Sequence, residues 1–229
     1  MKKIHRFLIP QIPAGPSLSI EDKDLAHLIK NVLKLSVGET CIVFADGSDD
    51  YISSIKSIEK DSIVLTVQSI SPKKNIPKKI TACVSITKRD SFELIVQKLT
   101  ELGIQKIVPI ISDRTVKQAL RIDRLQKISD EALEQSGGSK RVIISEPESL
   151  EKSLSSRKNI SKCYFDIEGG IYKKMTDIES AFYIGPEGGW SEEDKKMFEE
   201  YSVNSYKLGE TVLRAETAAI VCGYRLLWD

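Results

Sequence analysis

The chain has 229 residues, enough for one large domain or two small ones, and 41% of them are hydrophobic, which permits a full core. The net charge of +1 excludes a polycation that binds nucleic acid indiscriminately, so any RNA contact must come from local basic patches. The sequence has no signal-peptide pattern and no apolar stretch of about 18 residues. We therefore expect a soluble, cytoplasmic protein without a membrane span.

The cysteines predict neither a disulfide framework nor a metal site. There are four, each lying in a separate apolar run, and the chain has no C-x-x-C pair and only two histidines. Buried free thiols and no bound metal are the expectation for Cys41, Cys83, Cys163 and Cys222.

The N-terminal third has the pattern of a small β domain. Strands are expected over residues 6–9, 41–45, 51–58 and 62–69, with turn residues between them. Apolar residues at helical spacing predict one helix over residues 24–35. Together these elements suggest a small barrel over residues 1–71. Residues 72–79 contain two prolines and four lysines and are the predicted linker.

From residue 80 onward, strands and helices alternate. Strands are expected over residues 80–87, 105–111, 142–144, 163–167 and 181–184, and helices over residues 91–102, 122–135, 192–201 and 214–228. This alternation predicts an α/β domain over residues 80–229, with a mostly parallel sheet covered by helices on both faces.

Two glycine-marked segments near the C-terminus suggest a ligand pocket. After the apolar run 181–184, three glycines and a proline form a loop whose backbone can approach a ligand closely, and Ser191 is the expected N-cap of the next helix. Neither G-x-G-x-x-G nor the P-loop pattern is present, and Glu187 would repel phosphates. A neutral or zwitterionic ligand suits such a pocket better.

The pair of segments resembles a known family. Residues 184–189 read IGPEGG, and about twenty residues later LG-x-x-VLR-x-ETA occupies residues 208–218. This is similar to the signature of the SPOUT-class RNA methyltransferases, and more narrowly of the RsmE group, which methylates uridine N3 in 16S ribosomal RNA of the small subunit. Further segments of that group occur in the same order, at residues 5–7, 27–38, 92–103 and 134–137.

The resemblance implies a fold, a cofactor and partners. The expected fold is a SPOUT-type α/β domain with a C-terminal trefoil knot, preceded by a PUA-like RNA-binding β-barrel. S-adenosylmethionine is the expected cofactor and 16S ribosomal RNA, within the small subunit, the expected substrate. A homodimer that buries the C-terminal helix is also implied, with Ala218, Ala219 and Gly223 leaving room for close helix approach.

The resemblance also assigns site residues. The expected cofactor-binding residues are Ile184, Gly185, Pro186, Glu187, Gly188, Gly189, Leu208, Gly209, Val212, Leu213 and Thr217. Val212 and Leu213 would pack on the adenine or supply backbone hydrogen bonds to it, and they could also pack in the core. The expected RNA-binding residues are His5, Arg6, Lys34, Arg114, Lys140 and Arg141. Lys2 and Lys3 extend the basic N-terminus, although a basic cluster is more often only a solvated surface.

Arg214 and Glu216 are the candidate catalytic residues. Arg214 lies between apolar residues, where a buried charge would need a reason, and its guanidinium could stabilise a uracil anion. Alternatively, Arg214 pairs structurally with Glu216 or with another carboxylate. Glu216 could be the general base, an anchor for Arg214 or a cap of the helix. Two positions depart from the family pattern, because Lys34 and Gly138 stand where arginine is usual.

Two other functions remain open at this point. One is a SPOUT enzyme acting on another RNA target, such as a ribose 2′-oxygen. The other is an RNA-binding ribosome-assembly factor without catalysis, which cofactor binding would distinguish from an enzyme.

Overall fold

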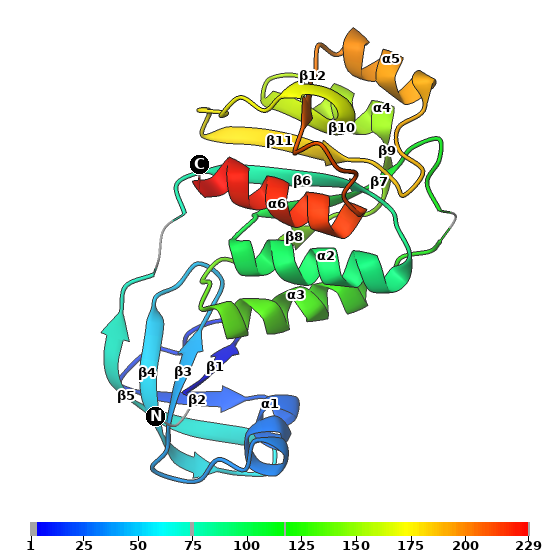
Figure 1. Ribbon diagram of the computed structural model, residues 1–229. Helices are drawn as coiled ribbons and strands as arrows, with labels where there is room; N and C mark the ends of the chain where they lie inside the picture. The colour runs from blue at the N-terminus through cyan, green and yellow to red at the C-terminus, as the bar shows by residue number, and fades with distance from the viewer. Residues whose placement is uncertain (1–3, 74–75, 117, 229) are drawn as a thin grey trace. The chain divides into compact units, whose positions relative to one another are not determined.

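The computed structural model describes residues 4–73, 76–116 and 118–228 (Figure 1). The chain divides into two compact units. The N-terminal unit comprises Met1–Asn75 together with Leu133–Arg141, and the C-terminal unit comprises Ile76–Ala132 and Val142–Asp229. The return of residues 133–141 to the N-terminal unit was not foreseen from the sequence.

The N-terminal unit is built on a five-stranded mixed sheet. Its strands are β1 (His5–Leu8), β2 (Ser17–Glu21), β3 (Thr40–Phe44), β4 (Asp50–Ile58) and β5 (Ser62–Ser71), in the order β1-β3-β4-β5-β2. Strand β1 runs parallel to β3, and the other neighbours are antiparallel. Four of the strands were predicted, and β2 was missed. Alternating residues of β2, such as Leu18 and Ile20, enter the core of this unit.

The predicted N-terminal helix forms with an unexpected second half. Helix α1 (Lys23–His27) begins after Asp22, whose carboxylate accepts a hydrogen bond from the Leu25 N–H at 2.9 Å. A π-helical segment, η1 (Leu28–Val32), continues it. Lys34 follows with φ of 54°, the left-handed conformation that commonly ends a helix and favours glycine.

The C-terminal unit contains a parallel sheet. Its strands are β6 (Lys79–Ser85), β7 (Lys106–Ile111), β8 (Ile143–Ile144), β9 (Glu148–Ser149), β10 (Ser161–Ile171), β11 (Glu179–Ile184) and β12 (Asn204–Lys207). The order is β12-β10-β11-β6-β7-β8, with β9 also on β7, and every pair is parallel. The α/β fold with a parallel sheet, predicted from the sequence, is confirmed. The short elements β9 and β12 were missed.

Helices cover both faces of this sheet (Figure 1). Helices α2 (Arg89–Leu102), α3 (Ile122–Ser136) and α6 (Ala215–Trp228) lie on one face, and α4 (Leu150–Ser156) and α5 (Glu192–Glu200) lie on the other. Successive residues of a strand point to opposite faces. On β11, Phe182 therefore joins the core under α2 and α6, and Tyr183 joins the core under α4 and α5. Helix α4 was not predicted.

Small residues of α6 pack inside the chain. A Cβ added to Gly223 would lie 2.9 Å from a methyl carbon of Leu99 on α2, and Ala219 is fully buried. The sequence interpretation placed Ala219 and Gly223 at an interface between two copies, and this was wrong because α2 of the same chain occupies that space. Ala218 is half-buried.

All four cysteines are buried free thiols, as expected. Burial raises the pKa of Cys41 to about 11 and the pKa of Cys163 to about 12, so both are protonated at neutral pH. Within the described residues, no helix is long and apolar enough to span a membrane, and no group of His, Cys, Asp and Glu side chains could hold a metal ion.

Candidate active site

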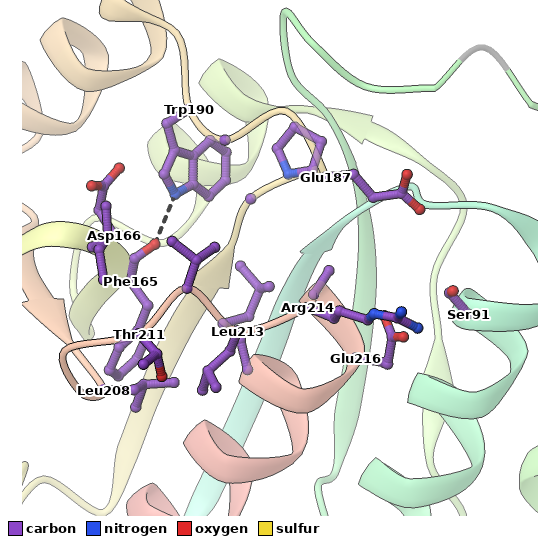
Figure 2. Close-up of a pocket in the computed structure, with 18 of the residues that line it drawn as sticks. Ser91, Phe165, Asp166, Glu187, Trp190, Leu208, Thr211, Leu213, Arg214 and Glu216 are labelled. Atoms are coloured by element: carbon purple, nitrogen blue, oxygen red, sulfur yellow. Dashed lines mark hydrogen bonds between the residues drawn. The ribbon is translucent and has the colours of Figure 1, made fainter.

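A cavity of about 700 Å³ opens where the strands of the C-terminal unit end. Because these strands are parallel, the loops that follow them meet at one edge of the sheet. Strands β6 and β11 are neighbours in the middle of the sheet. The connections from β6 lead toward β8 at one edge, and β11 lies on the side that ends at β12. The cavity therefore lies where the strand order changes direction, a common place for ligand sites in such sheets. The residues after β11 and β12, part of β10 and the starts of α2 and α6 line it (Figure 2).

The glycine loop, residues 185–190, is held rigidly. Gly189 has φ of 70°, which favours glycine, and its N–H donates to the Pro186 carbonyl at 2.9 Å. At the end of the loop, Ser191 and Asp194 form a capping box at the start of α5. The sequence thus specifies both the turn and the helix that ends it.

Trp190 closes one side of this loop. Its indole is buried, and its Nε1–H donates to the Phe165 carbonyl on β10 at 3.1 Å (Figure 2). A Cβ added to Gly185 would lie 3.1 Å from the indole ring, so any other residue would press on the ring. Trp190 lines the cavity and was not among the predicted site residues, although it directly follows the glycines.

The second predicted segment, residues 208–213, forms another wall of the cavity. Val212 is 82% exposed, so core packing, one of the two alternatives for this residue, is wrong. Leu213 is half-buried and lies between the cavity and the start of α6. The wall therefore offers both backbone and an apolar side chain to a ligand.

Charged side chains gather at one end of the cavity. Arg214 and Glu216 at the start of α6 and Ser91 on α2 line it there (Figure 2). Lys88 Nζ lies 3.8 Å from the Glu187 carboxylate at the same cavity. Arg214 is exposed, so the premise that its charge is buried was wrong; it precedes the first residue of α6. Across the described residues, the Arg214 side chain has no ion pair or hydrogen bond, and the alternative pairing with Glu216 is not formed.

Asp166 carries charge into the opposite part of the cavity, near Trp190 (Figure 2). Phe165 pairs with Ile184 across β10 and β11, so Asp166 is level with the start of the glycine loop. Its side chain is only 12% exposed and lies 4.0 Å from Lys195 Nζ. Lys195 also donates to Glu168, and this hydrogen bond lowers the pKa of the Glu168 carboxyl and raises the pKa of Lys195. Asp166 follows an apolar run, as the glycine loop does, and this pattern could have indicated from the sequence that Asp166 lies at the same edge of the sheet.

The structure brings most of the predicted pocket residues together. Among the described residues, Gly188 and Thr217 are the two cofactor-binding predictions that do not line the cavity. The others line it, together with both predicted catalytic residues. These lining residues are Ile184, Gly185, Pro186, Glu187, Gly189, Leu208, Gly209, Val212, Leu213, Arg214 and Glu216. Lys88, Ser91, Phe165, Asp166, Trp190 and Thr211 were not predicted, because they belong to other strands and loops or fall between motif positions.

Arg6, predicted to contact RNA, is tied into its own unit. Its guanidinium donates to the carbonyls of Leu133, Glu134 and Gly138 at 3.0–3.3 Å and to Asp50 at 2.7 Å. Only 9% of its side chain is exposed, and it lies over the Phe44 ring. The arginine satisfies carbonyls at the end of α3. These contacts favour a structural role.

The remaining RNA-binding predictions are distributed over both units. His5 stacks on Phe7, and Lys34 and Lys140 are exposed. The Arg141 N–H donates to the Asp46 carboxylate at 2.8 Å. Arg114, in the C-terminal unit, follows β7 and contacts the glycine loop. Lys2 and Lys3 lie outside the described residues.

Comparison with known proteins places the chain in a family. A family model for the RNA methyltransferase domain matches residues 74–226. The ribosomal RNA small subunit methyltransferase E of Aquifex aeolicus is 30% identical over 215 residues, which cover 90% of this chain and 92% of the relative. The chain belongs to the ribosomal RNA small subunit methyltransferase E family of RNA methyltransferases. The expected family is therefore confirmed.

Other relatives agree over almost the full length of this methyltransferase. The enzyme of the same name from Rickettsia conorii is 26% identical and covers 96% of this chain and 93% of its own. The crystal structure of a ribosomal RNA small subunit methyltransferase E from Neisseria gonorrhoeae, bound to S-adenosylmethionine, superposes with a TM-score of 0.88 at 25% identity. That match covers 96% of this chain and 95% of the other.

Proposed function

We propose that this methyltransferase transfers a methyl group from S-adenosylmethionine to N3 of a uridine in 16S ribosomal RNA of the small subunit. The observation that carries the proposal is the cavity where the two glycine-marked segments meet, with Arg214 extending from its edge without a protein partner. The relatives named for small-subunit ribosomal RNA support the substrate, and the Neisseria structure supports the cofactor.

The cavity residues fit the proposed cofactor. S-adenosylmethionine supplies an electrophilic methyl group on a sulfonium, and it carries an adenine, a ribose and a zwitterionic amino acid. Apolar side chains of Phe165, Ile184 and Leu213 offer a surface for the adenine. Asp166 offers an acceptor for hydroxyl or ammonium hydrogens, and Lys88 offers a cation for a carboxylate.

Arg214 fits the chemistry that uridine N3 requires. This nitrogen carries a weakly acidic proton and is a poor nucleophile until the proton leaves, after which negative charge spreads onto the two carbonyl oxygens of the base. A guanidinium with no protein partner can donate two hydrogen bonds to such an anion. Glu216, in the first turn of α6, lines the same cavity as Arg214 and is a carboxylate that could accept the proton.

The target base must be unpaired when it enters. N3 lies on the Watson–Crick edge, so a base in a helix would have to be unstacked or flipped out to reach the cavity. The exposed side chains of Val212 and Ile167 line this cavity and can contact the face of a flipped base.

A two-fold symmetric dimer is part of the proposal. The outward face of α6 carries Tyr224 and Trp228, whose side chains are 53% and 54% exposed, one helical turn apart. Cyclic two-fold symmetry is the commonest arrangement for soluble oligomers. Sedimentation at micromolar concentration should give the dimer mass, and Tyr224→Glu combined with Trp228→Glu should shift it to the monomer; a monomeric wild type would contradict this part.

Mass spectrometry of ribosomal RNA tests the function directly. Small-subunit RNA from a deletion strain should lack one methyluridine, and the purified protein with labelled S-adenosylmethionine should restore it. Fragmentation that places the methyl on N3 supports the proposal. A methyl on a ribose 2′-oxygen would replace it with the other SPOUT chemistry, and cofactor binding without any transfer would favour an assembly factor.

A further inference from the structure

Arg114 reaches from the loop after β7 to the backbone of the glycine loop. Its Nη1 donates to the Gly188 carbonyl at 3.0 Å and to the Trp190 carbonyl at 3.4 Å. Its aliphatic part lies along Gly188, because a Cβ added there would be 3.6 Å from Arg114 Cδ. The side chain therefore runs over the glycine loop, although the residue is exposed to solvent.

Each of these two carbonyls belongs to a peptide plane that is held at its other end as well. A carbonyl and the following N–H share one rigid plane. After Gly188, the Gly189 N–H donates to the Pro186 carbonyl at 2.9 Å, and after Trp190, the Ser191 N–H donates to Asp194 at 3.1 Å. Arg114 thus supplies the second anchor for both planes, and removing it leaves each plane free to tilt about its single remaining bond.

The loop that carries Arg114 is itself fixed. The Ser112 N–H donates to the Thr115 hydroxyl at 2.8 Å, and the Thr115 N–H donates back to the Ser112 carbonyl at 3.1 Å. The buried hydroxyls of Ser112 and Ser85 lie 3.2 Å apart, which ties this turn to β6. These hydrogen bonds fix the turn from which the Arg114 side chain extends.

We infer that Arg114 is a positioning residue for the cofactor: it fixes the Gly188 and Trp190 peptide planes so that Gly189 and the Trp190 indole keep their places in the cavity wall. This inference rests on the proposed function. It replaces the role in RNA binding that the family resemblance implied for Arg114. The residue acts through the loop, since Arg114 itself does not belong to the cavity lining within the described residues.

Arg114→Ala tests the inference, with Arg121→Ala as the matched control. Arg121 is an exposed arginine of the same connection between β7 and α3, and it pairs with Asp123 at 2.7 Å without touching the glycine loop. The dissociation constant and KM for S-adenosylmethionine should rise roughly 10-fold in Arg114→Ala, the scale of one charge-assisted hydrogen bond. At saturating cofactor, kcat should stay within about threefold, because the reacting groups remain in place.

Two further measurements separate positioning from an RNA contact and from general damage. Arg114→Lys should regain part of the cofactor affinity, since an ammonium can donate to one of the two carbonyls. Hydrogen exchange of a peptide covering residues 186–192, measured without cofactor, should be faster in Arg114→Ala than in wild type and in Arg121→Ala.

The possible results decide the matter. Unchanged affinity for the cofactor in Arg114→Ala would overturn the inference. If the salt dependence of binding to small-subunit ribosomal RNA falls at the same time, Arg114 contacts an RNA phosphate instead. Unchanged exchange in the loop would also overturn it. If the wild type binds neither S-adenosylmethionine nor S-adenosylhomocysteine, the proposed function fails, and the exchange measurement still reports whether Arg114 holds the loop.

Discussion

The two units of this methyltransferase use an arginine from a family motif in opposite ways. In the N-terminal unit, Arg6 is almost completely buried and donates to three carbonyls and a carboxylate. In the C-terminal unit, Arg214 is exposed at the cavity with no protein partner in the described structure. The two terminal nitrogens of Arg6 are used within the protein and stabilise the fold, whereas a guanidinium without protein partners is available to a substrate. The comparison predicts that loss of Arg6 changes stability and loss of Arg214 changes activity.

Arg214→Ala should give the largest effect. We expect kcat to fall roughly 10²-fold or more, the scale for losing one charge-stabilising donor in an active site, while the free energy of unfolding changes little because the side chain has no protein partner. Steady-state kinetics and thermal denaturation measure the two quantities. Arg214→Lys should recover only part of the rate.

Glu216→Gln is the companion to that variant. If it abolishes turnover while Arg214→Ala remains near wild type, the roles are reversed and the carboxylate carries the essential proton transfer. If Arg214→Ala unfolds at a clearly lower temperature than wild type, Arg214 also stabilises the fold, and the proposed difference between Arg6 and Arg214 is wrong.

Arg6→Ala should lower stability without changing cofactor affinity. The substitution leaves Asp50 and the carbonyls at the end of α3 without their donor, which we expect to cost about 2 kcal/mol. Chemical denaturation measures the loss, and calorimetry should show wild-type binding of S-adenosylmethionine. Lys140→Ala, which removes an exposed charge from the same unit, should leave stability unchanged. Equal stability of the two variants would remove the structural role from Arg6.

Gly185→Ala should weaken cofactor binding more than Gly188→Ala does. The new methyl of Gly185→Ala would lie 3.1 Å from the Trp190 ring, which its hydrogen bond to Phe165 keeps from moving freely. Overpacking of about 1.4 kcal/mol corresponds to roughly 10-fold in affinity. At Gly188 the nearest atom is 3.6 Å away, an ordinary contact. Equal affinities for the two variants in a calorimetric titration would show that the indole position does not matter.

Sequence patterns predicted the C-terminal unit well because the residues that define its glycine loop follow one another closely along the chain. A strand with an apolar run, a loop with three glycines and a capped helix follow one another within residues 181–200, and the parallel sheet then places the loop at its carboxyl edge. The residues that were missed, such as Asp166 and Ser91, reach the same cavity from other strands and helices. Their positions depend on strand order, which periodicity does not reveal.

The N-terminal unit was predicted less well because its key contacts join distant segments. Arg6 and the Leu8 N–H meet residues 133–138, including the Glu134 carboxylate at 2.7 Å, across more than a hundred residues of intervening chain. The motif at residues 5–7 was therefore interpreted as an RNA contact, and the motif at residues 134–137 only as a further segment of the family pattern. The structure shows that they hold each other. His5 and the exposed residues Lys34, Lys140 and Arg141 of that unit remain predicted RNA contacts.

Substitutions of Lys34 should give the smallest effects, and they test whether an exposed basic residue of the N-terminal unit contacts RNA. Lys34 combines an exposed charge with a strained backbone. Its φ of 54° is costly for a residue with a side chain, so Lys34→Gly should stabilise the protein by about 0.5 kcal/mol. If Lys34 contacts a phosphate, the same variant should reduce the slope of log affinity for small-subunit ribosomal RNA against log salt by about 0.9. Lys34→Arg keeps the charge and the strain, and its planar fork should bind the phosphate at least as tightly. A stabilised Lys34→Gly with an unchanged salt slope would show that Lys34, like Arg6, does not anchor the RNA.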